Sequence, residues 1–360
     1  MVGTISEDFF DNLARLTNLD LSNNNGLSIN INSTWIPRVQ VQRLNLKSCK
    51  ISGPFSKWLS TQFNIDSLNL SSYDLIGDIP SWVQDLQLEE LLLSNNHLLG
   101  HIPLGLCVQF LDISNNGIIG NIPVSLATCQ NLTILNVANN QLEGFIPEEF
   151  GIPQSINSLH IENNNSRGPI PSALSNCTQL QVLDLGNNAF NGNIPSWITN
   201  LSQLQVLSMR SNYFGGKIPL EIGQLSNLEV LDLFVNLLSA TIPPTIFNLS
   251  AMKQVQPQGS SYKVGNKFTF RSLYYQDSLE LTVKDRDTQY EYVLSSLTCI
   301  DVSNNQLRGH LPLEIGELKG LMIFNVSKNH LNGSIPKCLG DLRQLESLDL
   351  STNNFFGQIP

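Results

Sequence analysis

Apolar residues recur along this chain at a fixed spacing, in the pattern L-x-x-L-x-L-x-x-N-x-L-x-G-x-I-P with a period of 24 residues. One complete copy begins at Leu180, and the next two begin at Leu204 and Leu228. Alternating apolar residues over a short run predict a strand with one buried face. Thirteen such runs occur, so the pattern predicts an α/β solenoid, a horseshoe with one parallel sheet on its concave face.

An asparagine follows most of the predicted strands, where the backbone leaves the sheet. A side-chain amide both donates and accepts, so it can satisfy backbone groups that lose their ladder partners there. Cys49 and Tyr73 replace this asparagine in two copies, and we expect a local irregularity at Tyr73. The copy between Asn96 and Asn116 is shortened to 20 residues.

The second half of each copy carries the turn G-x-I-P. Glycine permits a backbone conformation that a Cβ atom hinders, and proline cannot donate to a further ladder. This half is therefore expected to run extended and then form a short 3-10 or helical turn on the convex side, as at 195–198. Ala240 replaces the glycine in the copy just before the periodicity fails.

The periodicity fails once, since the asparagine positions Asn236 and Asn305 lie 69 residues apart instead of 24. We therefore divide the chain into repeats at 1–252, an island insertion at 253–293 and further repeats at 294–360. Within the island, 268–275 and 278–284 alternate apolar and polar residues, which predicts short strands. Its tyrosines favour an ordered island packed on the concave side over a flexible insertion.

The charge balance is acidic, with 20 Lys and Arg residues against 30 Asp and Glu residues and a net charge of −10. This balance disfavours nucleic acid or an anionic membrane surface as a partner. No apolar run has the roughly 20 residues of a membrane span, and the first residues lack the features of a signal peptide. The chain begins and ends within a repeat, which we interpret as an incomplete solenoid.

The residues that could carry chemistry do not form a recognisable catalytic or metal-binding set. The six cysteines lack metal spacing and lie in separate repeats, so we interpret them as buried thiols rather than disulfides. His97 and His101 flank a turn and have no carboxylate or cysteine beside them. No nucleophile elbow, phosphate loop or kinase signature occurs. We therefore expect neither an enzyme nor a cofactor or metal.

Residues that flank the core leucines should form a binding surface on the concave face. Most are small and polar, so exposed aromatic and charged side chains stand out as candidate anchors. The candidates are Phe110, His160, Glu162, Arg210 and Phe234, joined from the island by Arg271, Tyr274 and Tyr275. Phe234 could instead pack beneath the island. An extended peptide of about ten residues would span the strands between Phe110 and Phe234.

Nine N-x-S/T sequons occur, and glycosylation requires an exposed asparagine. Asn164 is expected to be too buried, whereas Asn69 and Asn325 lie on the strand face. We expect glycans among the four sequons on the flank opposite the strands, Asn131, Asn176, Asn200 and Asn248.

The motif L-x-G-x-I-P resembles the plant-type leucine-rich repeat. An island a few repeats before the end, entered through 248–252 and containing Tyr274-Tyr275-Gln276-Asp277-Ser278-Leu279, is similar to that of plant receptor-like proteins. The resemblance implies a ligand-binding ectodomain at the plasma membrane that recognises a peptide or protein and signals in defence or development through a co-receptor kinase. From the sequence we expect this chain to depart from the family by lacking its signal peptide, both caps and the membrane helix.

Two other interpretations remain open. One is a secreted inhibitor of microbial cell-wall-degrading enzymes, such as polygalacturonase, because those inhibitors resemble this chain in L-x-G-x-I-P. They have fewer repeats and no island, which disfavours this interpretation. The other is a truncated receptor copy whose uncapped ends expose core leucines.

Overall fold

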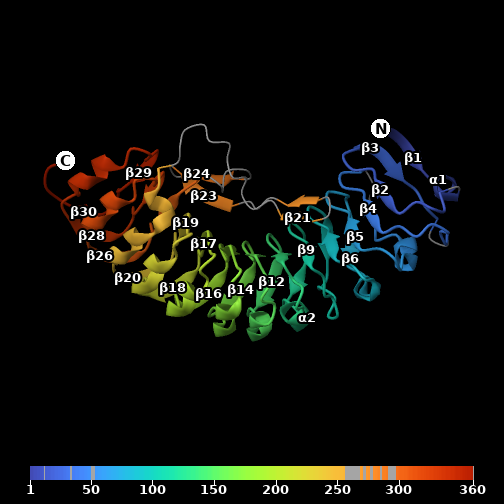
Figure 1. Cartoon of the computed structure of the whole chain (residues 1–360), viewed down its shortest axis with the longest axis horizontal. Coiled ribbons are helices and arrows are strands. Elements are labelled where there is room, and N and C mark those ends of the chain that lie inside the picture. The colour runs from blue at the N-terminus through green and yellow to red at the C-terminus, as the bar shows by residue number, and fades with distance from the viewer. Residues whose placement is uncertain are drawn as a thin grey trace. The chain divides into compact units, whose positions relative to one another are not determined.

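In a computed structural model of the chain, residues 1–11, 13–32, 35–49, 53–255 and 297–359 are described, with the backbone alone at 268–270, 273–275, 279–283 and 286–290. The chain divides into two compact units, Met1–Leu180 and Gln181–Pro360, which we describe in turn. Figure 1 labels their strands and helices. In both units the strands and turns follow the leucine-rich repeat, so the fold is a leucine-rich-repeat solenoid, as the sequence predicts.

The main sheet of the first unit is parallel and takes one strand from each copy. Its core leucines stand opposite one another in register, for example Leu68, Leu91 and Leu111. All three are fully buried, because each faces the interior between the sheet and the turns behind it. The strands, in spatial order, are β2 (Asn18–Asp20), β4 (Arg43–Asn45), β5 (Ser67–Asn69), β7 (Glu90–Leu92), β9 (Phe110–Asp112), β11 (Ile134–Asn136) and β13 (Ser158–His160).

The main sheet of the second unit is also parallel with one strand from each copy, and the island contributes no strand to it. Val230 of β19 stands opposite Cys299 of β25, so two strands separated by the whole insertion are direct neighbours. The repeat therefore resumes in register after the island. The strands are, in spatial order, β15 (Val182–Asp184), β17 (Val206–Ser208), β19 (Val230–Asp232), β25 (Cys299–Asp301), β27 (Ile323–Asn325) and β29 (Ser347–Asp349).

Short helices follow the strands, as the turn I-P predicts. Proline precedes most of them and sets the extended conformation before the first helical residue, as Pro195 does before Ser196–Asn200. In the first unit they are α1 (Glu7–Asp11), η1 (Lys57–Thr61), η2 (Ser81–Asp85), α2 (Val124–Thr128), η3 (Glu148–Gly151) and η4 (Ser172–Asn176). In the second they are η5 (Ser196–Asn200), η6 (Leu220–Gln224), η7 (Pro244–Asn248), η8 (Ser250–Lys253), η9 (Leu313–Glu317) and η10 (Lys337–Asp341).

A second set of parallel strands, which the sequence analysis describes only as extended segments, lies between each main strand and its helix. In the first unit it comprises β10 (Ile119–Gly120), β12 (Gln141–Gly144) and β14 (Asn165–Gly168), with the separate pairs β1 (Val2–Ile5) with β3 (Gly26–Ile29) and β6 (Ile76–Asp78) with β8 (His97–Leu99). In the second unit it comprises β16 (Ala189–Asn193), β18 (Tyr213–Gly216), β20 (Leu237–Thr241), β26 (Gln306–His310), β28 (His330–Gly333) and β30 (Asn354–Phe355).

The asparagine ladder is confirmed in atomic detail. The Asn96 amide donates to the carbonyls of Leu70 at 2.9 Å and Leu93 at 2.8 Å, and its Oδ1 accepts from the Tyr73 and Leu75 amides at 3.1 and 2.9 Å. One side chain thus satisfies backbone groups of two copies, which would otherwise be buried without partners.

The predicted irregularity at Tyr73 is also confirmed. The residue before the ladder position is left-handed in every copy, as Ser72 is with a φ of 53°, but here Asp74 after it is left-handed as well, with a φ of 59°. Ala240, which replaces the motif glycine, likewise has a φ of 69°. An alanine in this region costs about 1 kcal/mol relative to glycine.

The interpretation of all cysteines as thiols is wrong for two of them. Cys107 and Cys129 form a disulfide, with Cα atoms 5.4 Å apart. Cys107 lies in the shortened copy, which has no helix between β8 and β9 within the described range 53–255. The shortened chain path brings Cys107 beside the end of α2 in the next copy, a proximity that repeat spacing alone does not reveal. Cys49, Cys177 and Cys299 are buried thiols, and Cys338 is a half-buried one.

The island contains two antiparallel pairs of strands, which confirms strands in both predicted segments and adds β24 (Arg286–Tyr290), which was not predicted. In the first, β21 (Phe268–Phe270) pairs with β22 (Leu273–Tyr275). In the second, β23 (Leu279–Val283) pairs with β24 (Arg286–Tyr290). The division of the chain into repeats, island and repeats stays a prediction.

Candidate binding surface

The strand face is the side of each main sheet that turns away from the leucine core. It is built from the residues that alternate with the core leucines. In the first unit the register aligns Ser67, Glu90, Phe110 and Ile134 in one row of this face. A parallel row contains Leu92, Asp112, Asn136 and His160. Two of the predicted anchors, Phe110 and His160, therefore lie in these strand-face rows.

The expectation that these anchors are exposed is wrong for three of them. Phe110 is 2% exposed, His160 1% and Arg210 3%, whereas Glu162 and Phe234 are half-buried. Neighbouring strands lie only about 4.8 Å apart, so a large side chain packs on its cross-strand neighbours instead of standing free. Arg271 lies outside the described residues, as do the side chains of Tyr274 and Tyr275, whose backbone belongs to β22.

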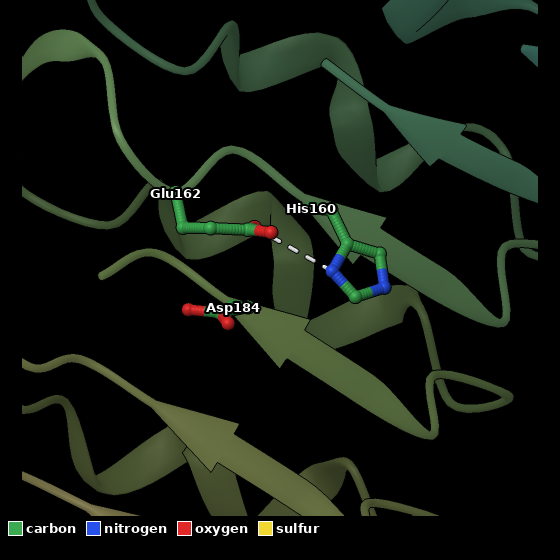
Figure 2. A group of neighbouring side chains, drawn as sticks. All are labelled: His160, Glu162 and Asp184. Carbon is green, nitrogen blue, oxygen red and sulfur yellow. Dashed lines mark ion pairs between the residues drawn. The ribbon is translucent and has the colours of Figure 1, made fainter. Parts of the chain in front are cut away.

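His160 and Glu162 form a pair at the end of β13. The Nδ1 atom of His160 lies 3.5 Å from Oε2 of Glu162, and Figure 2 shows the two side chains directed toward one another. The glutamate is the more exposed partner, with 14% of its side chain accessible.

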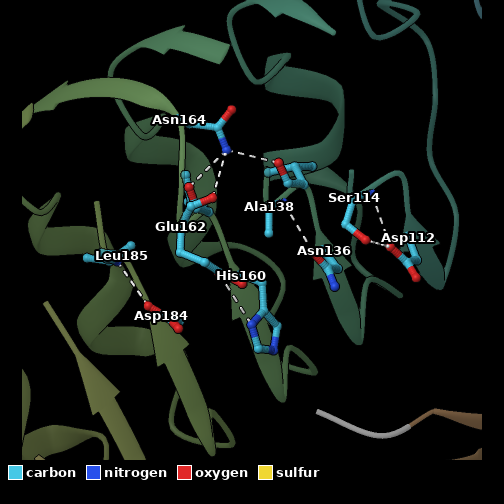
Figure 3. A network of polar contacts seen from close by, with 12 residues as sticks. Asp112, Ser114, Asn136, Ala138, His160, Glu162, Asn164, Asp184 and Leu185 are labelled. Carbon is cyan, nitrogen blue, oxygen red and sulfur yellow. Dashed lines mark hydrogen bonds and ion pairs between the residues drawn. The ribbon is translucent and has the colours of Figure 1, made fainter. Parts of the chain in front are cut away.

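Polar residues at the ends of the strands support the backbone turn. Oδ1 of Asp112 accepts from the amide and the hydroxyl of Ser114 at 3.1 and 2.7 Å, and Oδ1 of Asn136 accepts from the amide of Ala138 at 3.1 Å (Figure 3). This short-range bond competes with extension of the strand and turns the chain. Asp and Asn at this position therefore have a structural role as well as any part in binding.

Glu90 is a buried carboxylate that the sequence analysis does not single out. Its Oε2 accepts from the Ser67 hydroxyl at 2.6 Å, and its Oε1 has no hydrogen-bond partner among the described residues. Burial raises the pKa of this carboxyl. The acid is thus held in an environment that favours its neutral form.

The second unit carries a row of carboxylates on its strand face, also missed from sequence. Asp184, Ser208, Asp232 and Asp301 stand in consecutive register, and Asp232 is directly opposite Asp301. Burial and the charge of Asp301 raise the pKa of Asp232, and burial raises the pKa of Asp301. The signal in the sequence is an aspartate that ends three strands, as in Val182-Leu183-Asp184 and Val230-Leu231-Asp232.

Arg210 is the cation beside this row. Its Nε lies 3.8 Å from Oδ2 of Asp232, and its guanidinium lies over the ring of Phe234 at 5.2 Å from the centroid. Both contacts favour a charged guanidinium in a buried position. The two predicted anchors of this unit, Arg210 and Phe234, are thereby brought together.

An apolar row runs beside the carboxylates. Val182, Val206, Val230, Cys299 and Ile323 stand in register and belong to one cluster, each no more than 5% exposed. The strand face of this unit therefore combines a hydrophobic row with an ionisable one.

The four favoured sequons lie where a glycan could be attached. Asn131, Asn176, Asn200 and Asn248 are all exposed, and the last three each end a helix that follows a main strand. Asn164 is 8% exposed because its amide belongs to the asparagine ladder. Accessibility is required for modification, so these positions support the proposal of glycans on that flank.

Sequence comparison places the chain among known repeat proteins. The family described as Leucine Rich Repeat matches residues 87–108, 107–129, 131–151, 179–201, 203–225 and 296–318. Receptor-like protein EIX2 of Solanum lycopersicum is 43% identical over 102 residues, which are 28% of this chain and 10% of that protein. Receptor-like protein 31 of Arabidopsis thaliana is 36% identical over 93 residues, 25% of this chain and 11% of that protein. The matched segments thus span about a tenth of these relatives.

Solved structures with the same architecture include receptor ectodomains. The Arabidopsis receptor kinase HAESA ectodomain, in complex with an IDA peptide hormone, matches 100% of this chain and 57% of its own with a TM-score of 0.73 and 29% identity. The PEPR1–AtPEP1 structure matches 98% of this chain and 47% of its own with a TM-score of 0.73 and 26% identity. In the described part of this chain no helix could span a membrane. The periodic strands, the asparagine ladder and these likenesses together show a leucine-rich-repeat fold, and parts of the sequence are similar to plant receptor-like proteins.

Proposed function

We propose that the chain is part of a ligand-binding ectodomain that recognises a peptide or protein through its strand face and its island. The observation that carries this proposal is the direct pairing of β19 with β25. The repeat needs no insertion at this point to continue its sheet, so the island is an addition to a scaffold that is complete without it.

The strand face supplies groups suited to recognition. Phe234 and Glu162 are half-buried, so part of each side chain remains accessible to a ligand. Aromatic and charged side chains are the usual energetic anchors of interfaces. The HAESA ectodomain was solved with a peptide hormone, which supports a peptide as the ligand class.

The proposal includes a co-receptor kinase at the plasma membrane. Signalling would then proceed through this kinase. A role in defence or in development is compatible with such an assembly, and the four exposed sequons are proposed to carry glycans that keep their flank free of protein contacts.

The test is removal of the island without damage to the repeat. The deletion should begin after residue 255, because the carbonyl of Met252 accepts from the amide of Gly320 at 2.9 Å and Met252 is fully buried. Residues 256–293 would be replaced by a short Gly/Ser linker in the full-length receptor, with Leu220→Ser on an exposed helix position as the matched control.

We expect the linker variant to keep its cooperative thermal unfolding and to lose ligand-induced association with the co-receptor, while Leu220→Ser retains both. An unchanged ligand response in the linker variant would overturn the role of the island. Inhibition of a polygalacturonase by the intact chain would instead support the inhibitor interpretation.

A further inference from the structure

The carboxylate row of the second unit, Asp184, Asp232 and Asp301 with Ser208 between the first two, has more negative groups than cations. Arg210 contacts the row, with its Nε atom 3.8 Å from Oδ2 of Asp232. Asp184, Asp232 and Asp301 are each at most 3% exposed. Buried carboxylates without matching cations are destabilising, so each must be compensated by a proton, a hydrogen bond or a bound cation.

Hydrogen bonds account for part of this compensation. Asp301 accepts from the amide and the hydroxyl of Ser303 at 2.9 and 2.6 Å and from the Asn325 amide at 3.0 Å. Asp232 accepts from the amide of Phe234 at 3.0 Å, and Asp184 from that of Gly186 at 2.9 Å. The facing pair Asp232 and Asp301 still requires a proton, because two carboxylates side by side cannot both ionise readily.

A second, independent feature points to a missing partner. The hydroxyl of Ser208 is completely buried, and it has no hydrogen-bond partner among the described residues. Ser208 stands between Asp184 and Asp232 in the register of the sheet. A buried hydroxyl without a partner is costly, so its position marks a place where a donor could bind.

We propose that Asp184, Ser208, Asp232 and Asp301 form a subsite for a cationic group of a peptide ligand, an ammonium or a guanidinium. Three carboxylates and a free hydroxyl acceptor match the donors of such a group, which makes only donated hydrogen bonds. The cation replaces the proton shared by Asp232 and Asp301, and that proton passes to solvent.

In this proposal the ligand cation reaches the subsite past Phe234 and Arg210. The Phe234 side chain is half-buried, whereas the row is closed, and the ring contacts the Arg210 guanidinium that lies beside Asp232. Its face already holds the Arg210 guanidinium and can hold a second cation as Arg210 moves aside. The other ionisable groups that act on the pair are Asp184 and Arg210, and the pair in turn helps to raise the pKa of the Cys299 thiol. The remaining contacts come from the Phe234 amide, Ser303 and Asn325.

The inference rests on the proposed peptide-binding function, and the test separates the two. The protein would be screened on an array of random peptides of roughly 12 residues, long enough to cross the strands of this unit. Each binder would be remade with Lys replaced by acetyl-lysine, with Arg replaced by citrulline, and with the amino terminus free or acetylated. Asp232→Asn is the main variant and Asp301→Asn the second.

Asp349→Asn is the matched control. Asp349 occupies the same position of its copy and accepts from the amide of Ser351 at 2.9 Å, as Asp232 does from Phe234, but it is half-buried and lies two strands beyond the facing pair. Both substitutions keep an oxygen acceptor for the turn, so a difference between them reports the buried charge. Thermal unfolding would verify that each variant folds.

We expect neutralisation of one cation to weaken binding by about tenfold in the wild type and in Asp349→Asn, and by less than about twofold in Asp232→Asn. Titration calorimetry in buffers of different ionisation enthalpy should show proton release on binding that is lost in Asp232→Asn. Loss confined to amino-terminal acetylation would assign the cation to the peptide amino terminus. Binders that are indifferent to neutralisation would overturn this inference alone, and the absence of any peptide binder would overturn the proposed function as well.

Discussion

Cys107 and Cys129 are bonded to one another across two consecutive copies of the repeat, with their Cα atoms 5.4 Å apart. One of these copies is the shortened one, which has lost its helix within the described range 53–255. The covalent link joins the shortened copy to the end of α2 in the next copy, and it restricts the unfolded chain over 22 residues.

Removal of this disulfide should destabilise the first unit. For the double variant Cys107→Ser/Cys129→Ser we expect a loss of about 3 kcal/mol in the free energy of unfolding, because the unfolded chain regains the freedom of the closed loop. Urea denaturation with and without reductant measures this loss in the free energy of unfolding. Cys338→Ser removes a free, half-buried thiol and should change little. Equal stability of the double variant and the wild type would contradict a structural role.

Replacing an asparagine of the ladder should lower the free energy of unfolding more than replacing an asparagine on the surface. The Asn212 amide donates to the carbonyls of Leu185 and Arg210 at 2.9 Å, and its Oδ1 accepts from the Phe190 amide at 2.9 Å. Asn212→Ala leaves these buried groups unpaired, so we expect a loss of about 3 kcal/mol in the free energy of unfolding.

The control for this substitution is Asn227→Ala. Asn227 is exposed and donates one bond, to the carbonyl of Ser202 at 2.8 Å, so a loss below about 1 kcal/mol is expected. Chemical denaturation of both variants compares the positions. If the two losses were the same, the ladder would not be a special source of stability.

The buried acids predict that the second unit is more stable in mild acid. Burial raises the pKa of Asp232 and Asp301 above the ordinary 3.8, and it raises the pKa of Glu229 to about 7. The folded state therefore binds protons more tightly than the unfolded state. This contribution is fully present below about pH 4 and is lost as the pH rises through the neutral range.

We expect the free energy of unfolding to fall from pH 5 to pH 8, and Asp232→Asn to reduce that fall by roughly 2 kcal/mol. Denaturation series at several pH values measure the slope. Asp349→Asn should leave it unchanged. If the free energy of unfolding depended on pH in the same way in Asp232→Asn and in the wild type, the Asp232 carboxyl would not be the source of that dependence.

Glycan mapping tests the assignment of the sequons. After expression through a secretory pathway, we expect Asn131, Asn176, Asn200 and Asn248 to be occupied, because all four are exposed. Asn164 should be unmodified, since its amide donates to the carbonyls of Val137 and Ile161 inside the ladder. Mass spectrometry of glycopeptides provides the occupancy, and a glycan on Asn164 would be incompatible with this ladder.

The sequence pattern predicts the architecture well because the repeat is enforced locally. The core leucines, the ladder asparagines and the helix that starts at Ser196 all depend on residues one copy away or less. The second set of strands is harder to predict, because its residues, such as Asn191 and Tyr213, show no apolar alternation and pair only through the backbone.

The exposure and packing of the side chains on the strand face could not be predicted in the same way. Whether Arg210 is exposed depends on Asp232 and Phe234, which lie in the next copy, and on how the three side chains pack. The apolar row that includes Val206 and Val230 is visible in the sequence only after the copies are aligned. The disulfide depends on the shortened path of the chain in one copy, and the regular spacing of the repeat does not show that this path brings the two cysteines together.

The reach of the ladder has a consequence for how such proteins can change length. Each ladder amide contacts backbone groups of its own copy and of the copy before it, as Asn236 does with Leu233 and Met209. In-frame duplication or loss of one complete copy by recombination therefore recreates the same bonds at the new junction. A family of genes can in this way vary the number of copies, and with it the length of its binding surface, without inventing a new core.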